Sequence, residues 1–111
     1  MSESVACAVV NNNDDLNKIL KATDRVITLF YASWCPFCTR FLPIFTKHAE
    51  GEGRRFVLVQ DDRETIADNY SIRIYPTVLF FEQGVVSKRL DGVPGVGLDE
   101  NRLVEFVGSC P

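Results

Sequence analysis

The chain has 111 residues, of which 46% are hydrophobic, and its formal net charge at pH 7 is −3. This length predicts one compact domain over residues 1–111, and the apolar content is high enough for a buried core, which argues against a disordered chain. The acidic balance argues against a general affinity for nucleic acid or anionic membranes, because both select basic surfaces.

The N-terminal segment shows no targeting pattern and contains the first predicted elements. No stretch of the chain approaches the ~18 uninterrupted apolar residues of a membrane span. Residues 1–10 lack the basic start and the long apolar run of a secretory signal, so we expect a cytoplasmic protein. Val5–Val10 predicts a first strand, and Asn13 or Asp14 is expected to cap the helix that follows.

The next segment predicts a buried strand followed by a helix. Arg25–Ala32 is a continuous run of apolar β-formers, long enough for a central strand that is buried on both faces. A helical pattern starts at Cys35, contains Pro43, which is expected to kink the helix, and ends at Gly51–Gly53. Phe56–Val59 predicts a second buried strand.

The last third of the chain predicts a short helix, a hairpin and a final helix. Asp61–Asn69 is expected to be helical. Thr77–Phe81 and Val85–Leu90 flank a turn at Gln83–Gly84, which is a hairpin signal, and Asp99 is expected to cap the last helix. The order β-α-β-α-β-α-β-β-α predicts an α/β fold in which a central mixed sheet is flanked by helices on both faces.

The four cysteines separate into one close pair and two distant residues. Cys35 and Cys38 form a C-x-x-C pair at the junction between the buried strand and the following helix, with Pro36 suited to the first helical position. A helix N-terminus carries unpaired N–H groups and partial positive charge, which stabilise a thiolate at Cys35. Cys38 lies one turn further along the same face and can close a disulfide. The pair therefore indicates thiol–disulfide exchange, with Cys35 as the nucleophile and Cys38 as the resolving thiol.

Other polar and sulfur-containing residues are expected to have structural roles. Zinc needs about four ligands, and Cys7, Cys110 and His48 are isolated in the sequence, so we expect no metal site. His48 is expected to be a solvated helix residue. The sequence does not place Cys7 near Cys110, which leaves both a bridge and a free surface thiol open. Asp61 and Asp62 are expected to be turn and cap residues rather than catalytic carboxylates.

Pro76 is the second element of the candidate site. The local pattern alone places it in an ordinary trans peptide at the start of a strand. Together with the cysteine pair, however, it completes a combination that resembles the thioredoxin family from about Val26 to Gly92. The residues that carry this resemblance are Trp34-Cys35-Pro36-Phe37-Cys38, Pro43, Tyr70-Ser71-Ile72-Arg73-Ile74-Tyr75-Pro76-Thr77, Gly84 and Gly92.

The resemblance implies a thioredoxin fold and assigns roles around the cysteine pair. Pro76 would be the family's cis-proline, packed against the pair, and the backbone of Tyr75 would bind an extended substrate strand. Trp34 would be a partly exposed ring beside the site, and Phe37 is expected to be exposed next to the nucleophile. The expected substrate-binding residues are Trp34, Pro36, Phe37, Tyr75, Pro76 and Gly92.

The chain departs from the thioredoxin pattern around the cysteines. Pro36-Phe37 replaces the usual Gly-Pro and is closer to the Pro-Tyr of glutaredoxins. Leu29 stands where the family has a buried acid, and Val57 stands where a lysine commonly accompanies it. Without that acid the proton of Cys38 must leave through water or the substrate thiol, which predicts slow resolution near neutral pH. Tyr75 replaces a frequent Ile and offers partners a larger apolar contact and a hydroxyl.

The combined pattern favours an enzyme that reduces protein disulfides and needs no cofactor. We expect a monomer that takes part in cell redox homeostasis and is recharged by a thioredoxin-reductase-like electron donor. A glutathione-linked, glutaredoxin-like protein is one alternative, although the Gly-Gly…Asp signature is missing and Asp91-Gly92 is a poor substitute. An oxidant or isomerase-type exchanger is a second alternative. A non-catalytic or zinc-binding module on the same fold is the third.

Overall fold

The computed structural model describes residues 7–50 and 54–111. The predicted order of strands and helices is confirmed except at the third helix, where only a short 3₁₀ helix forms; residues 5–6 of the predicted first strand and the helix end predicted at Gly51–Gly53 lie outside the described residues. In chain order the elements are β1 (Cys7–Val10), α1 (Asn13–Ala22), β2 (Arg25–Tyr31), α2 (Pro36–Ala49), β3 (Arg55–Gln60), the 3₁₀ helix η1 (Ala67–Tyr70), β4 (Thr77–Glu82), β5 (Val85–Leu90) and α3 (Glu100–Ser109).

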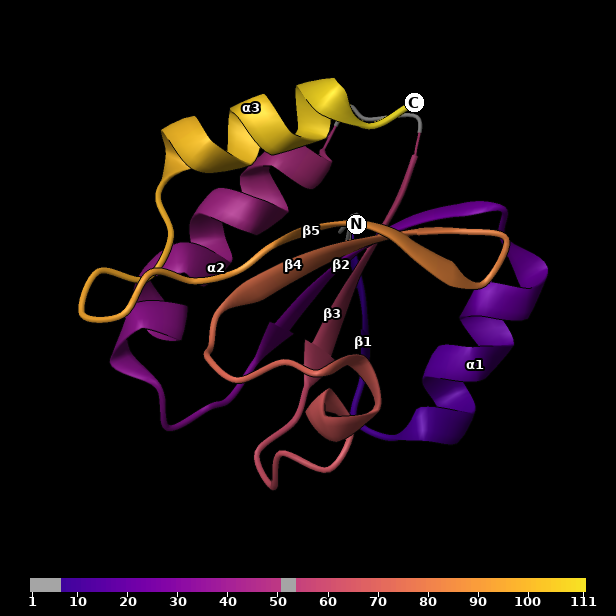
Figure 1. Ribbon diagram of the computed structural model, residues 1–111, viewed down its shortest axis with the longest axis horizontal. Helices are drawn as coiled ribbons and strands as arrows, with labels where there is room; N and C mark the ends of the chain where they lie inside the picture. The colour runs from indigo at the N-terminus through magenta and orange to yellow at the C-terminus, as the bar shows by residue number, and fades with distance from the viewer. Residues whose placement is uncertain (1–6, 51–53) are drawn as a thin grey trace, which may run out of the picture.

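The five strands form one mixed sheet in the order β1-β3-β2-β4-β5. β1, β3 and β2 run parallel, whereas β4 is antiparallel to β2 and β5 is antiparallel to β4. Figure 1 shows α2 and α3 together on one side of the sheet and α1 with η1 on the other. The predicted α/β class with helices on both faces is therefore confirmed. None of the helices in the described ranges has both the length and the apolar content needed to cross a bilayer.

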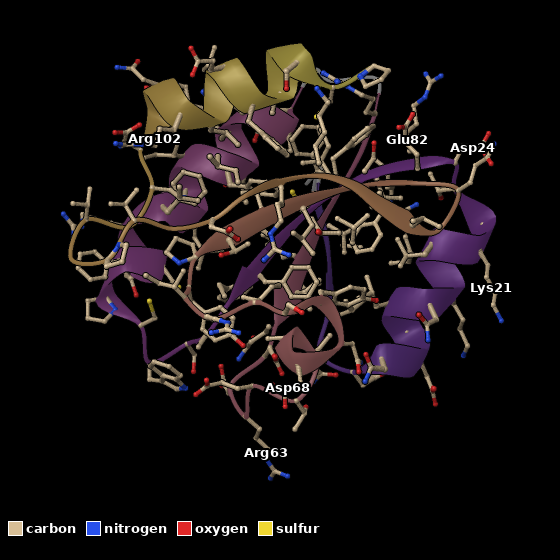
Figure 2. All side chains as sticks on the ribbon, in the orientation of Figure 1. Lys21, Asp24, Arg63, Asp68, Glu82 and Arg102 are labelled. Carbon is tan, nitrogen blue, oxygen red and sulfur yellow. The ribbon has the colours of Figure 1, made fainter. Side chains whose placement is uncertain are left out.

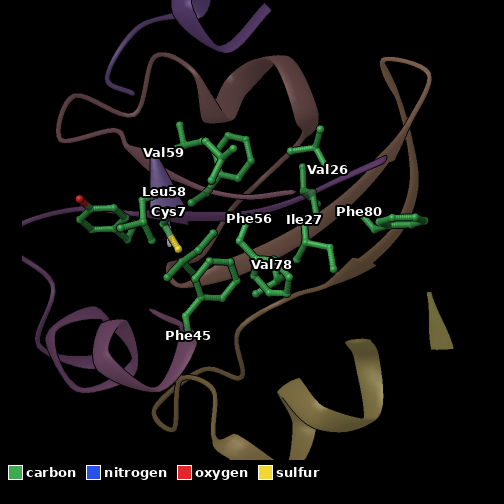
Figure 3. Close-up of a cluster of buried hydrophobic side chains, with 14 of the residues drawn as sticks. Cys7, Val26, Ile27, Phe45, Phe56, Leu58, Val59, Val78 and Phe80 are labelled. Carbon is green, nitrogen blue, oxygen red and sulfur yellow. The ribbon is translucent and has the colours of Figure 1, made fainter. Parts of the chain in front are cut away.

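The central strand β2 organises the core. Every residue from Val26 to Tyr31 is buried, as expected for a strand with neighbours on both edges and helices on both faces. Leu29 pairs with Leu58 of β3 on one side and with Val78 of β4 on the other. Aromatic rings join the sheet to α2, where the centroids of Phe45 and Phe56 lie 5.3 Å apart (Figure 3). Charged side chains such as Lys21 and Arg63 point away from this core (Figure 2).

The hairpin that closes the sheet has the predicted turn and one irregularity. Gln83 and Gly84 have φ values of 52° and 82°, and positive φ at both central positions is what a tight two-residue hairpin turn requires. The pairing shifts between Phe80 and Phe81, so that β5 carries one extra residue, Ser87, in a bulge. β5 is the outer strand, and most of its side chains are exposed.

Helix starts are set by side-chain caps. The prediction of Asn13 or Asp14 as the cap of α1 is wrong, because the cap is Asn12, whose side-chain oxygen accepts the N–H of Asp15 at 2.8 Å. The prediction for the last helix is correct: the Asp99 carboxylate accepts the N–H of Arg102 at 2.9 Å.

The predicted helix over Asp61–Asn69 is also wrong. Only the four residues of η1 are helical, and the preceding segment is a loop. Glu64 has a φ of 59°, which a right-handed helix does not allow. The side chain of Asp61 accepts the N–H groups of Thr65, Ile66 and Ala67, and so replaces the carbonyl acceptors that a regular helix would supply.

Candidate active site

The two cysteines lie where the chain leaves β2 and enters α2. Pro36 is the first helical residue and Cys35 is the N-cap. The Cys35 sulfur accepts the N–H of Cys38 at 3.3 Å, so it takes the place that a polar capping oxygen occupies in other helices. An anionic sulfur at this position is stabilised by the N–H group and by the helix dipole. The geometry thus suits a nucleophile at Cys35.

Cys38 is the more deeply buried partner. It is fully buried, whereas Cys35 is 5% exposed, and both are free thiols in the structure. Burial raises the pKa of the Cys38 thiol well above its usual value, and its hydrogen bond with Cys35 raises it further. Cys38 therefore keeps its proton at neutral pH. The two thiols differ as a nucleophile and a resolving group should.

The opposite wall of the site is the Tyr75–Pro76 peptide, which is cis as the family resemblance implies. The carbonyl oxygen of Tyr75 accepts a hydrogen bond from the Cys35 thiol at 3.8 Å, so this wall touches the proposed nucleophile. Gly92 lies directly against Pro76: a Cβ built on Gly92 would lie 2.5 Å from the Pro76 carbonyl oxygen. The absence of a side chain at Gly92 thus lets the two chain segments come together.

A groove of about 350 Å³ runs between the two walls. Among the expected substrate-binding residues, Trp34, Pro36, Phe37 and Tyr75 line it. Pro76 and Gly92 do not; they lie next to the groove and support the Tyr75 wall. The structure adds four lining residues that sequence reasoning did not identify, namely Glu64, Ile72, Arg73 and Ile74.

Asp62 holds the wall formed by Ser33 and Trp34. Its carboxylate accepts the backbone N–H and the hydroxyl of Ser33, each at 2.7 Å, and its carbonyl oxygen accepts the Trp34 indole N–H at 3.0 Å. The hydrogen bonds from Ser33 lower the pKa of the Asp62 carboxyl. Trp34 is 58% exposed even though its indole N–H is hydrogen-bonded to Asp62. Its ring is therefore presented at the rim in a fixed orientation.

Asp61 binds the wall formed by Tyr75. The Tyr75 hydroxyl donates to the Asp61 carboxylate at 2.8 Å, and both side chains are buried. The expectation that this hydroxyl faces partners is wrong, because it points into the protein. The turn role expected for Asp61 is correct, but the contact with Tyr75 was missed. A usable signal existed: two adjacent aspartates follow a buried strand that is parallel to the strand before Cys35, and such strand ends share one edge of the sheet.

Two further expectations are corrected by long-range contacts. Phe37 is half-buried rather than exposed, since the chain at Gly97 packs on it so closely that a Cβ there would lie 2.9 Å from the Phe37 Cβ. His48 is not a lone solvated residue, because its Nε2 lies 2.7 Å from a carboxylate oxygen of Glu100 at the start of α3. For Cys110 the sequence left a bridge and a free surface thiol open; in the structure it is a free but buried thiol, which donates to the Phe106 carbonyl oxygen at 3.3 Å.

Cys7 is also buried and free. Burial raises its pKa to about 11, so it stays a neutral thiol in the core. In the parts of the chain that the structure describes, no three His, Cys, Asp or Glu side chains come together in a way that could hold a metal ion.

Comparisons with known proteins show what the chain is similar to. The family model described as "Thioredoxin" matches residues 7–108. Protein disulfide-isomerase A5 of Bos taurus is 36% identical over 81 residues, covering 68% of this chain and 16% of that protein. A thioredoxin-like protein of Fusarium culmorum is 35% identical, with 68% and 66% covered. The thioredoxin of Mycoplasmoides gallisepticum is 35% identical over 94 residues, with 82% and 94% covered.

Solved structures match over nearly the whole chain. A mutant thioredoxin from Halobacterium salinarum superposes with a TM-score of 0.79 at 24% identity, covering 98% of this chain and 95% of that one. Plasmodium falciparum thioredoxin gives a TM-score of 0.82 at 20% identity, with 94% and 99% covered. At these identities the structures establish the shared fold.

The Gly92 contact makes a testable prediction. Gly92→Ala would force the Pro76 carbonyl and the loop apart, so we expect a loss of about 1–3 kcal/mol in the free energy of unfolding, typical of overpacking. Chemical denaturation measures it. Gly108→Ala is the matched control, because nothing lies within 4 Å of its added Cβ and alanine favours the helix. Equal stability of both variants would show that the Gly92 loop shifts without cost.

Proposed function

The chain belongs to the thioredoxin family, and on this basis we propose that it is a thiol–disulfide oxidoreductase that reduces protein disulfides through Cys35 and Cys38. One observation carries the assignment of roles: the Cys35 sulfur caps α2 at the edge of a groove, while Cys38 is fully buried behind it. The first sulfur can reach a substrate disulfide, and the second can reach only Cys35.

The reaction takes two exchange steps. The Cys35 thiolate attacks one sulfur of the substrate disulfide, forming a mixed disulfide and releasing the other substrate sulfur as a thiolate that takes up a proton. Cys38 then loses its proton and attacks the Cys35 sulfur, which releases the second substrate thiol and closes the Cys35–Cys38 disulfide. Two electrons pass from the protein to the substrate. A thioredoxin-reductase-like donor must return them to start another cycle.

The groove supports recognition of an extended protein segment. Its Tyr75 wall offers backbone, its Trp34 and Phe37 side offers aromatic surface, and Glu64 and Arg73 add charges of both signs. An extended segment laid along Tyr75 would pair with the backbone there, while its disulfide meets Cys35. Substrates are thus proposed to be chosen mainly by backbone conformation rather than by net charge.

A second candidate function differs only in the direction of electron flow. Similarity to protein disulfide-isomerase A5 favours an oxidant or isomerase role, in which the Cys35–Cys38 disulfide is donated to substrates. The same two exchange steps then run in reverse. Reduction potential separates the two functions, because it fixes which form of the cysteine pair persists.

The reduction potential is the first test of the proposed direction. Trp34 is the only tryptophan and adjoins Cys35, so its emission, followed across dithiothreitol and glutathione ratios, should report the state of the pair. We expect a midpoint near about −270 mV, as in thioredoxin, whereas a value near about −180 mV would support the isomerase direction. Cys38→Ser is the control and should give no two-electron transition. The absence of a transition in the unmodified protein would contradict redox function altogether.

Substitution of Cys35 and substitution of Cys38 should have different effects on the reaction. Cys35→Ser should abolish reduction of insulin disulfides, because the nucleophile is lost. Cys38→Ser should accumulate insulin adducts, since the mixed disulfide forms but cannot be resolved. Non-reducing electrophoresis shows such adducts, and dithiothreitol should release them. The assigned roles would be reversed if adducts accumulated in Cys35→Ser instead.

The apolar surroundings of Cys38 make the second step slow. Leu29 and Val57 are both fully buried, so the positions where the family carries an acid and a lysine offer no proton acceptor. We expect Leu29→Asp to accelerate resolution of a preformed mixed disulfide at pH 7 by about tenfold or more, because a positioned general base typically contributes about 10²–10⁴-fold. Leu29→Asn is the control, because asparagine has the shape and polarity of aspartate but does not accept the proton. Stopped-flow fluorescence measures both, and equal rates would rule out proton removal as the limiting event.

A further inference from the structure

Asp61 is a buried carboxylate for which the proposed exchange steps have no use. It is 3% exposed at the end of β3. Burying a carboxylate is costly unless donors surround it, and here the N–H groups of Thr65, Ile66 and Ala67 bind it at 3.0, 3.1 and 2.7 Å. The loop from 61 to 67 is thus wrapped around this side chain, which fixes the position of its oxygens.

The Thr65 hydroxyl adds a longer bond of 3.5 Å to the same carboxylate, and a further donor reaches it from the other side of the site. The Tyr75 hydroxyl donates to it at 2.8 Å and also lies 3.3 Å from the Asp61 carbonyl oxygen. Tyr75 is 9% exposed, and burial together with this bond raises the pKa of its phenol, so the hydroxyl remains a donor. The ring of Tyr75 also rests 6.2 Å, centroid to centroid, from that of Trp34.

Tyr75 therefore connects two different environments. Its side chain ends on Asp61, and its main-chain carbonyl accepts the Cys35 thiol at 3.8 Å. The neighbouring Asp62 holds Ser33 and Trp34 on the facing wall. Asp61 and Asp62, which are consecutive residues at the end of β3, are therefore hydrogen-bonded to the two walls of the groove. Because these two residues are adjacent in the backbone, their bonds fix the distance between the walls.

We propose that Asp61 is a positioning residue that acts through the Tyr75 hydroxyl to hold the Tyr75 backbone edge against Cys35, and that this contact sets a preference for extended protein segments over small disulfides. The inference rests on the proposed reductase function. An extended protein segment pairs with the Tyr75 backbone over several of its own residues, so its disulfide meets the Cys35 sulfur only if that backbone is at the correct distance. A small disulfide needs only access to Cys35.

Tyr75→Phe isolates the hydroxyl, since it keeps the ring and its contact with Trp34. Pre-reduced protein is mixed with insulin or with hydroxyethyl disulfide, and oxidation of the pair is followed by Trp34 emission. We expect the second-order rate constant for insulin to fall about threefold to tenfold, in line with the loss of one buried hydrogen bond, and to fall clearly more than the rate constant for hydroxyethyl disulfide. The ratio of the two rate constants is the readout, because general damage to the cysteine pair lowers both.

Two more variants test the route through Asp61. Tyr70→Phe is the matched control: Tyr70 is half-buried between Phe30 and Phe81, and its hydroxyl makes no hydrogen bond among the described residues, so the ratio should not change. Asp61→Asn should lower the ratio as Tyr75→Phe does. The double variant should be no worse than the more affected single variant, because both changes break the same contact.

The outcomes distinguish this inference from the function on which it rests. If the unmodified protein reduces neither insulin nor hydroxyethyl disulfide, the reductase function itself is wrong. If it reduces both and Tyr75→Phe leaves the ratio unchanged, or lowers both rate constants equally, the positioning role is overturned while the function stands. Additive effects of Asp61→Asn and Tyr75→Phe would also overturn it, since the two residues would then act separately.

Discussion

The parallel pairing of β2 with β3 is the constraint from which the whole site follows. The pairing runs to Tyr31 and Gln60, and the N–H of Asp61 extends it by one bond to the Tyr31 carbonyl oxygen at 2.8 Å. Parallel strands end at the same edge of a sheet, so the chain entering the Cys35 turn and the chain leaving β3 emerge together. A register shift of one residue would send these side chains to opposite faces. Burial of β2 on both faces keeps the register fixed.

Local patterns in the sequence were sufficient for the fold and for the cysteine pair. Apolar runs identified the central strands, and the strand–helix junction identified Cys35 and Cys38, because period and junction are encoded by neighbours in the chain. The contacts of Asp61 with Tyr75, of His48 with Glu100 and of Phe37 with Gly97 were not predicted. Each contact joins residues more than ten positions apart, and no local pattern specifies which distant residue a given side chain will contact.

The prediction of a helix over Asp61–Asn69 is wrong because a side chain takes over the hydrogen bonds of the backbone there. Ile66 and Tyr70 have the four-residue spacing of one helix face, yet Asp61 offers its carboxylate to the backbone N–H groups that a helix would use. The loop that results places Glu64 at the groove and aims Asp61 at Tyr75. Irregular backbone at this point is therefore part of how the site is built, in the same way that the missing side chain of Gly92 admits the Pro76 carbonyl.

The exposed outer strand β5 has a consequence for a protein that is proposed to bind its substrates through their backbone. Such a protein must avoid pairing with its own copies, and exposed edge strands invite that pairing. The outer strand β5 carries Lys88 and Arg89 on its exposed surface with a bulge at Ser87. Positive charge and broken register both discourage edge-to-edge association. The β5 edge is thereby kept from competing with the groove, where a disulfide can be exchanged.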